Sequence, residues 1–174
     1  MSETILATGT YTIENVDRRN DIFLADDTLV AGSSELNADP PLDACWKVIR
    51  LRNGRFTISL ASQQNLYASW PTTLSLGSAI VTSPTPHRWV VREARVKDTF
   101  VISHAQHQLY WGIEDDEEVT PVKLCHPPTG SGNQWRFRRV NSKTVTPQSE
   151  IESGNIGENV DSRQLFRPRA TPKN

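Results

Sequence analysis

The feature of this sequence that most limits its fold is an internal repeat with a period of about 44 residues. An aromatic residue opens the first alternating segment of each unit, at spacings of 45 and 44 residues: Tyr11, Phe56 and Phe100. A tryptophan closes each unit, at spacings of 43 and 46 residues: Trp46, Trp89 and Trp135. Independent landmarks that share one period indicate a true threefold repeat.

The repeated segments have the pattern of β-strands. GTYTIENV, GRFTISLA and DTFVISHA alternate apolar and polar residues, and no window has the 3.6-residue periodicity of a helix. A second apolar pair also recurs once in each unit, at spacings of 44 and 43 residues: Ile22-Phe23, Leu66-Tyr67 and Leu109-Tyr110. These patterns predict an all-β protein.

The number of units selects one architecture. Propellers close with about four to eight blades, so three four-stranded units favour a β-trefoil with pseudo-threefold symmetry instead. We expect a trefoil domain over residues 1–140, with repeats at about 8–51, 53–94 and 97–140. Residues 141–174 contain one aromatic residue, Phe166, and three prolines. That composition predicts a flexible, disordered polar tail.

Composition excludes several classes of partner. The chain has 19 basic and 20 acidic residues, which argues against nucleic acid and against a polybasic membrane contact. No apolar run approaches the roughly 20 residues of a spanning helix, and MSETILATGT lacks the pattern of a secretory leader. Cys45 and Cys125 are expected to be separate reduced thiols. We therefore expect a cytoplasmic protein, with a monomer as the default state.

No catalytic or metal-binding motif is present, so we expect a protein that is not an enzyme and needs no cofactor or metal. His104 and His107 are three residues apart, a spacing that serves metals on helices but is ordinary in a turn. The acidic run of residues 114–118 lacks the alternating ligands and central glycine of a calcium loop. We interpret this run as a solvated hairpin tip that could steer a basic partner.

The opening TGTYTIENV and three units that each close on a tryptophan resemble the mushroom β-trefoil serine-protease inhibitors of the cospin type. The resemblance covers about residues 8–140. It implies a fungal inhibitor that inserts a loop of its first repeat into the cleft of a serine protease. In that family the inhibitory turn joins the second and third strands of the first unit and contains an asparagine. Here the turn has Asp26, Asp27 and Thr28, and aspartate suits the acidic pocket of trypsin-like enzymes poorly.

Two other segments are candidates for a protease-binding loop. Arg18, Arg19 and Asn20 lie between the first two strands, where an arginine could pair with a buried aspartate of trypsin. Residues 33–44 form a long connection stiffened by prolines that exposes Leu36 and Asn37. The Asn53-Gly54 pair predicts a two-residue hairpin that is too short to enter a cleft.

A carbohydrate-binding lectin is the alternative function, because ricin B-like lectins share this fold. Trp70, Trp111 and Tyr110 are the candidate residues for stacking on a sugar. Ricin-type units tend to end in Gln-x-Trp, whereas the three equivalent positions here are Ala44, His87 and Asn133. A cysteine-protease inhibitor, as among other mushroom trefoils, is a third hypothesis.

Overall fold

A computed structural model describes residues 5–33, 39–115, 117, 119–128 and 130–141. Leu36 and Asn37, and the predicted tail from residue 142, lie outside the described residues. The described part is all-β, with two single 3₁₀ turns at Leu42–Ala44 (η1) and Ser131–Asn133 (η2). It contains no helix long and apolar enough to cross a membrane.

The strands fall into three consecutive sets, one for each predicted unit. The first set is β1 (Gly9–Asn15), β2 (Asn20–Ala25), β3 (Thr28–Ser33) and β4 (Trp46–Arg50). The second set is β5 (Phe56–Leu60), β6 (Tyr67–Ser69), β7 (Val81–Ser83) and β8 (Trp89–Glu93). The third set is β9 (Phe100–His104), β10 (Tyr110–Gly112), β11 (Val119–Pro121), β12 (Lys123–Cys125) and β13 (Trp135–Arg139). In this last set the third strand is interrupted at Val122, which gives thirteen strands instead of twelve.

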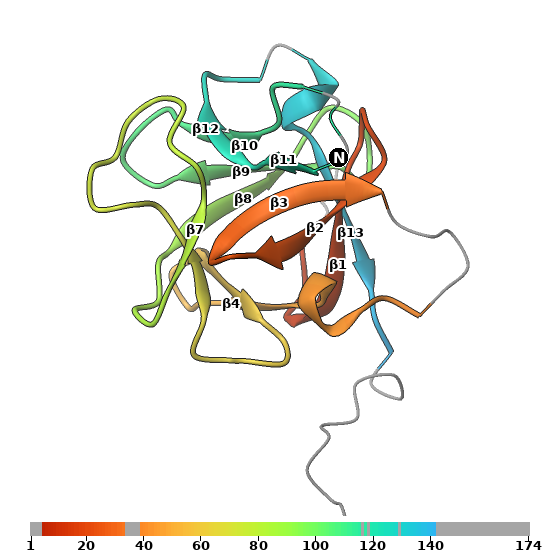
Figure 1. Ribbon diagram of the computed structural model, residues 1–174. Coiled ribbons are helices and arrows are strands. Elements are labelled where there is room, and N and C mark those ends of the chain that lie inside the picture. Colours follow the sequence, from red (N-terminus) through yellow and green to blue (C-terminus); the bar gives the residue numbers. More distant parts are fainter. Residues whose placement is uncertain (1–4, 34–38, 116, 118, 129, 142–174) are drawn as a thin grey trace, which may run out of the picture.

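Six of the strands close into a barrel. Antiparallel pairing runs around the ring β1–β4–β5–β8–β9–β13 and returns to β1, so none of these strands is left at an edge (Figure 1). Each unit contributes its first and last strands to the ring. The middle strands form three hairpins, β2–β3, β6–β7 and β10–β12, on top of it. This arrangement is the β-trefoil that the repeat predicts.

The three hairpins meet at a small cycle of backbone hydrogen bonds. The N–H of Leu29 donates to the carbonyl of Ile80, that of Ile80 to Val122, and that of Val122 to Leu29, at 2.8–2.9 Å. All three side chains are fully buried. The cycle passes once through each repeat, so it marks the pseudo-threefold axis.

The repeated tryptophans form the core, as their spacing predicts. Trp46, Trp89 and Trp135 are fully buried. Each lies directly opposite the aromatic residue that opens the same unit. Each indole Nε1 donates to a carbonyl in the second strand of its unit: Ile22, Ala68 and Trp111, at 2.9–3.2 Å. These bonds satisfy the only polar group of each buried ring.

The second predicted landmark is wrong by two residues in the first unit. Tyr67 pairs with Ser59 and Tyr110 with Ser103, but the equivalent pair in the first unit is Asp21 with Glu14. Asp21, not Phe23, is therefore the counterpart of the two tyrosines. The apolar pair Ile22-Phe23 resembles Leu66-Tyr67 and Leu109-Tyr110 in sequence, but it does not occupy the equivalent positions in the strand pairing.

The two cysteines are free thiols, as expected, with Cys45 buried and Cys125 half-buried. Burial is the main cause that raises the pKa of each thiol above its ordinary value. No cluster of three or more metal-ligating side chains occurs within the described ranges.

Candidate functional site

The second repeat has a pocket of about 400 Å³ on its hairpin. Its walls come from the end of β6 with the residues that follow it, from β7, and from the residue two before Trp89. The lining residues are Ser69, Trp70, Pro71, Thr72, Val81, Thr82, Ser83 and His87. The volume lies within the range of about 300–1,000 Å³ of small-molecule sites. An aromatic ring surrounded by hydroxyl groups can bind a polar ligand that also has an apolar face.

Trp70 forms the aromatic wall of this pocket. Its ring is partly buried, and it meets the core tryptophan Trp89 edge to face with ring centroids 5.1 Å apart. The rings of His87 and His104 lie against it, with centroids at 4.0 and 4.3 Å. These neighbours hold the indole in one orientation, so a ligand would meet a preorganised surface.

His87 supplies the pocket with a hydrogen-bond acceptor. The Ser69 hydroxyl donates to the carbonyl of Trp70 at 2.9 Å, and its oxygen lies 2.6 Å from Nδ1 of His87. We assign the one hydroxyl hydrogen to the Trp70 carbonyl, which makes Nδ1 the donor of the second bond. Nε2, which is 3.3 Å from the same oxygen, then keeps its lone pair. Burial lowers the pKa of His87, which favours this neutral form.

The other two repeats close the equivalent place. In the first, Asp26 and Asp27 make a two-residue turn directly after β2, so no long connection opens a pocket there. In the third, Lys123 and Glu114 form an ion pair of 2.8 Å. Lys123 has the register position of Val81, so this pair lies where the second repeat has its pocket wall. The pocket of the second repeat therefore lies where the first repeat has a tight turn and the third has an ion pair.

The residue pairs beneath the hairpins differ in size from one repeat to the next. In the second repeat, the small Ser69 accommodates His87. In the third, Gly112 accommodates Asn133, whose amide nitrogen would lie 2.3 Å from a β-carbon built on the glycine. Asn133 donates to the carbonyl of Trp111 at 3.2 Å. In the second and third repeats, the residue two before the closing tryptophan thus contacts the second strand of its own repeat.

Of the three aromatic residues expected to stack on a sugar, Trp111 is excluded by its burial. It is fully buried, between Trp89 at 5.1 Å and Trp135 at 6.4 Å. A ring with no exposed face cannot receive a sugar, so this expectation was wrong for Trp111. Tyr110 is half-buried in β10, where it pairs with Ser103 and Cys125. Trp70 alone of the three lines the pocket.

The turn expected to be inhibitory is a tight hairpin. Asp26 and Asp27 have φ angles of 46° and 61°, and Ala25 pairs directly with Thr28. Positive φ at both central residues is the mark of a type I′ turn. A substrate-like loop needs an extended backbone, which this turn does not present. The carbonyl of Asp27 instead accepts the N–H of Thr82 at 2.8 Å, so Asp27 lies at the edge of the second-repeat pocket.

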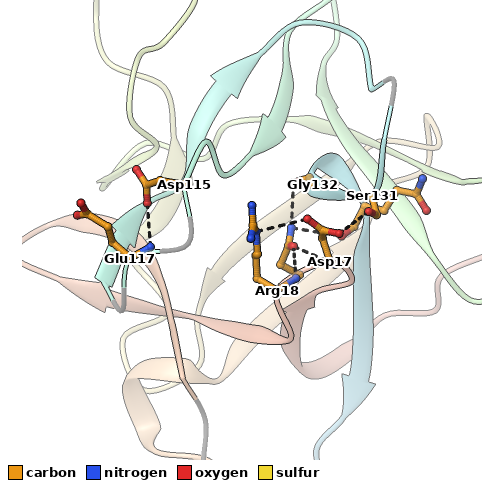
Figure 2. A network of polar contacts seen from close by, with 8 residues as sticks. Asp17, Arg18, Asp115, Glu117, Ser131 and Gly132 are labelled. Atoms are coloured by element: carbon orange, nitrogen blue, oxygen red, sulfur yellow. Dashed lines mark hydrogen bonds and ion pairs between the residues drawn. The ribbon is translucent and has the colours of Figure 1, made fainter.

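The arginine loop of the first repeat is also folded back on the molecule (Figure 2). Arg18 pairs with Asp17 at 3.3 Å, and Asp17 accepts a 2.6 Å hydrogen bond from the Ser131 hydroxyl. Arg19 has a φ of 56°, and its N–H donates to Asn15 at 2.9 Å. Neither arginine lies in an extended segment, and Asn20 is the first residue of β2. The arginine loop and the Asp26-Asp27 turn lie at opposite ends of β2, so they do not form one surface.

Sequence reasoning did not assign a role to His87 or to the hydroxyl groups around it. The available signal was its place two residues before a repeated tryptophan. That position differs in all three units, with Ala44, His87 and Asn133, whereas the tryptophans do not vary. A position that varies from repeat to repeat, beside a tryptophan that does not, marks where repeats can differ in function.

Comparisons with known proteins agree with this architecture. No protein-family model and no curated protein sequence matches the chain. Among solved structures, the chain is similar to the Macrolepiota procera ricin B-like lectin in complex with lactose, with a TM-score of 0.69 and 19 % identity. The match covers 79 % of this chain and 99 % of that one.

Two further structures show the same likeness. The Rhizoctonia solani agglutinin has a TM-score of 0.68 at 19 % identity and covers 80 % of this chain and 100 % of its own. The designed threefold-symmetric protein ThreeFoil has a TM-score of 0.65 at 11 % identity, with coverages of 76 % and 99 %. Identities this low show the fold and nothing finer. The chain is a β-trefoil protein.

Proposed function

We propose that this protein is a carbohydrate-binding module, without catalytic activity, whose binding site is the second-repeat pocket. The observation that supports this most strongly is the combination of the Trp70 ring, the His87 imidazole and hydroxyl groups around one hollow. A sugar ring has an apolar face of C–H groups that suits an aromatic wall. Its hydroxyls are both donors and acceptors, so they suit a neutral histidine and serine or threonine side chains.

The structural neighbours support the same class of ligand. One is described as a lectin in complex with lactose, and another is described as an agglutinin. Because their identity to this chain is 19 %, they suggest which ligand to try first and do not define it. Lactose is therefore the first probe.

The serine-protease hypothesis has less support in the geometry. Its two described loops are a type I′ turn and a turn tied to Asp17 and Ser131, whereas inhibition needs an exposed, extended loop. Its third loop, with Leu36 and Asn37, falls outside the described residues. We therefore keep protease inhibition only as a control assay.

The test is a glycan array probed with the full chain, followed by calorimetric titration of lactose and of the best array glycan. We expect saturable binding that Trp70→Ala weakens at least tenfold, because the aromatic wall is lost. Ile113→Ala is the matched control, since Ile113 is also partly buried against the core and follows β10 in the third repeat as Trp70 follows β6. Binding that is absent from the array, or unchanged by Trp70→Ala, would refute the proposal.

A parallel assay tests the alternative hypothesis of protease inhibition. Trypsin, chymotrypsin, subtilisin and papain are titrated with the same preparation. We expect full residual activity of all four at micromolar protein. Stoichiometric inhibition of one enzyme, together with no glycan binding, would replace the carbohydrate proposal with the inhibitor hypothesis.

A further inference from the structure

A separate hollow of the molecule is lined by arginines. A groove of about 410 Å³ is lined by Arg50, Arg55 and Arg92. A second groove, of about 550 Å³, is lined by Arg50 and Arg52. The two share Arg50 and the segment Ile5-Leu6, so they adjoin. We call this combined surface, marked by its four arginines, the arginine groove.

Basic side chains outnumber acidic ones in the lining of the arginine groove. None of its four arginines forms an ion pair with any residue that the structure describes. The single acidic residue in the lining of the two grooves is Glu93. Its carboxylate accepts the backbone N–H of Asp98 at 3.1 Å. The whole chain has a net charge of −1, so this concentration of positive charge is local.

The backbone that bears these arginines is preorganised. The N–H of Leu51 donates to the carbonyl of Arg55 at 2.7 Å, which leaves three residues in the turn between β4 and β5. Gly54 has a φ of 76°, which a glycine adopts without strain. The turn is therefore one residue longer than the expected two-residue hairpin. On the other side, the N–H of Arg50 donates to the Thr8 hydroxyl at 3.0 Å.

The shape and the lining of the arginine groove limit the class of ligand. Two adjoining hollows with four cationic groups suit an extended polyanion better than a single small ion. The apolar residues of the lining are aliphatic apart from Phe56, which is 3 % exposed. Single-stranded nucleic acids are held largely by stacking of bases on exposed aromatic rings, and the lining offers none.

We propose that the arginine groove binds a sulfated oligosaccharide. A guanidinium group donates two parallel hydrogen bonds to a sulfate, and successive sulfates along a sugar chain can reach successive arginines. This site is distinct from the second-repeat pocket, and the inference does not depend on the proposed function of that pocket.

The experiment measures binding of the full chain to a size-defined heparin decasaccharide at several salt concentrations. We expect saturable binding that weakens as salt rises. The triple variant Arg50→Ala, Arg55→Ala, Arg92→Ala should bind at least tenfold more weakly. The matched control is Arg19→Ala, Arg88→Ala, Arg139→Ala, which removes the same charge from exposed arginines outside both grooves. This control should bind within about twofold of the wild type.

Three further arms make the result decisive. The chemically desulfated decasaccharide, inorganic sulfate alone and a single-stranded DNA of equal charge are titrated beside the heparin fragment. Equal loss of affinity in both triple variants would reduce the effect to net charge and overturn the proposal. So would equal binding of the desulfated sugar, or tighter binding of the DNA. Trp70→Ala should leave heparin binding unchanged, which separates this site from the second-repeat pocket.

Discussion

Asn15 and His104 hold the first turns of the first and third repeats with the same pair of hydrogen bonds. Each side chain accepts the backbone N–H groups two and three residues further along, at 3.0–3.2 Å. They also share one register position, because Asn15 lies opposite Trp135 and His104 opposite Trp89. The imidazole nitrogen Nδ1 thus takes the place of the amide oxygen Oδ1. Unlike the amide, it loses its acceptor when it binds a proton.

Stability is therefore expected to fall in acid through His104. Burial, then the positive charges of His107, His87 and Arg55, lower the pKa of His104 below its ordinary value of about 6.5. The unfolded chain then binds the proton more tightly than the folded one. The contribution of His104 to stability is complete above about pH 6.5 and is lost as the pH falls through the lowered pKa.

The variant His104→Asn tests this linkage. Asparagine is the residue that caps the first repeat, and it does not titrate. Between pH 7.5 and pH 5, urea unfolding should show the wild type losing about 1–2 kcal/mol more than the variant, the order of one or two hydrogen bonds. Parallel losses in the two proteins would contradict a role for His104.

Ligand binding should also weaken in acid, through His87. The neutral Nε2 accepts a hydrogen bond from the ligand in our account, and protonation converts it into a donor. Because burial lowers the pKa of His87, binding should be constant above about pH 6.5 and should decline below it. His87→Gln keeps an acceptor but does not titrate, so its affinity should change less between pH 7.5 and pH 5 in calorimetry. An equal decline in both proteins would show that another group titrates.

An ion-pair network around a buried carboxylate joins β1, the first strand of the barrel, to β13, the last. The Glu14 side chain is 2 % exposed and contacts the guanidinium groups of Arg136, at 3.0 Å, and Arg138. Replacing both arginines by alanine leaves a buried carboxylate unpaired, which should cost about 3–5 kcal/mol of unfolding free energy. Glu14→Ala leaves two partly exposed arginines that water can solvate, so it should cost less. Urea unfolding that ranks the two variants the other way would contradict this account.

The pseudo-threefold axis should be sensitive to cavities. Ile80 is fully buried, and its backbone belongs to the cycle with Leu29 and Val122. Ile80→Ala should lower the unfolding free energy by about 2–5 kcal/mol, because it removes buried methyl groups and leaves a void. Val119, which is 54 % exposed, is the control, and Val119→Ala should change stability by about 0.5 kcal/mol or less. A loss of unfolding free energy below about 1 kcal/mol for Ile80→Ala would contradict this prediction, because it would mean that the side chains around the axis repack to fill the void.

The fold could be predicted because the repeated aromatic residues and tryptophans fill the core in each unit. Tyr11 and Trp46, for example, face each other across neighbouring barrel strands, and the other two units repeat this pair. A barrel with pseudo-threefold symmetry needs similar volumes in equivalent places, so these residues recur in sequence. The misplaced landmark Ile22-Phe23 shows the limit of the method. Apolar residues two positions apart look alike in an alternating strand, and only pairing fixes the register.

The site was harder to predict because it lies where the repeats differ. Trp70 and Trp111 look equivalent as extra tryptophans, yet Trp111 has the register position of Ala68, and Trp70 lies two places further along. The large Trp111 fills space in the core that Ala68 leaves to other side chains. The pocket needs Ser69 and His87 to fit together across 18 residues of sequence, and no local pattern shows that fit.

The most direct test of the carbohydrate-binding account follows the indole N–H signals of the five tryptophans by NMR while the best array glycan is titrated into the labelled full chain. We expect the Trp70 signal to shift and saturate with the affinity found by calorimetry. The signals of Trp46 and Trp135, whose N–H groups donate to buried carbonyls, should stay in place. Saturating binding that leaves the Trp70 signal unmoved would contradict the assignment of the second-repeat pocket as the carbohydrate site.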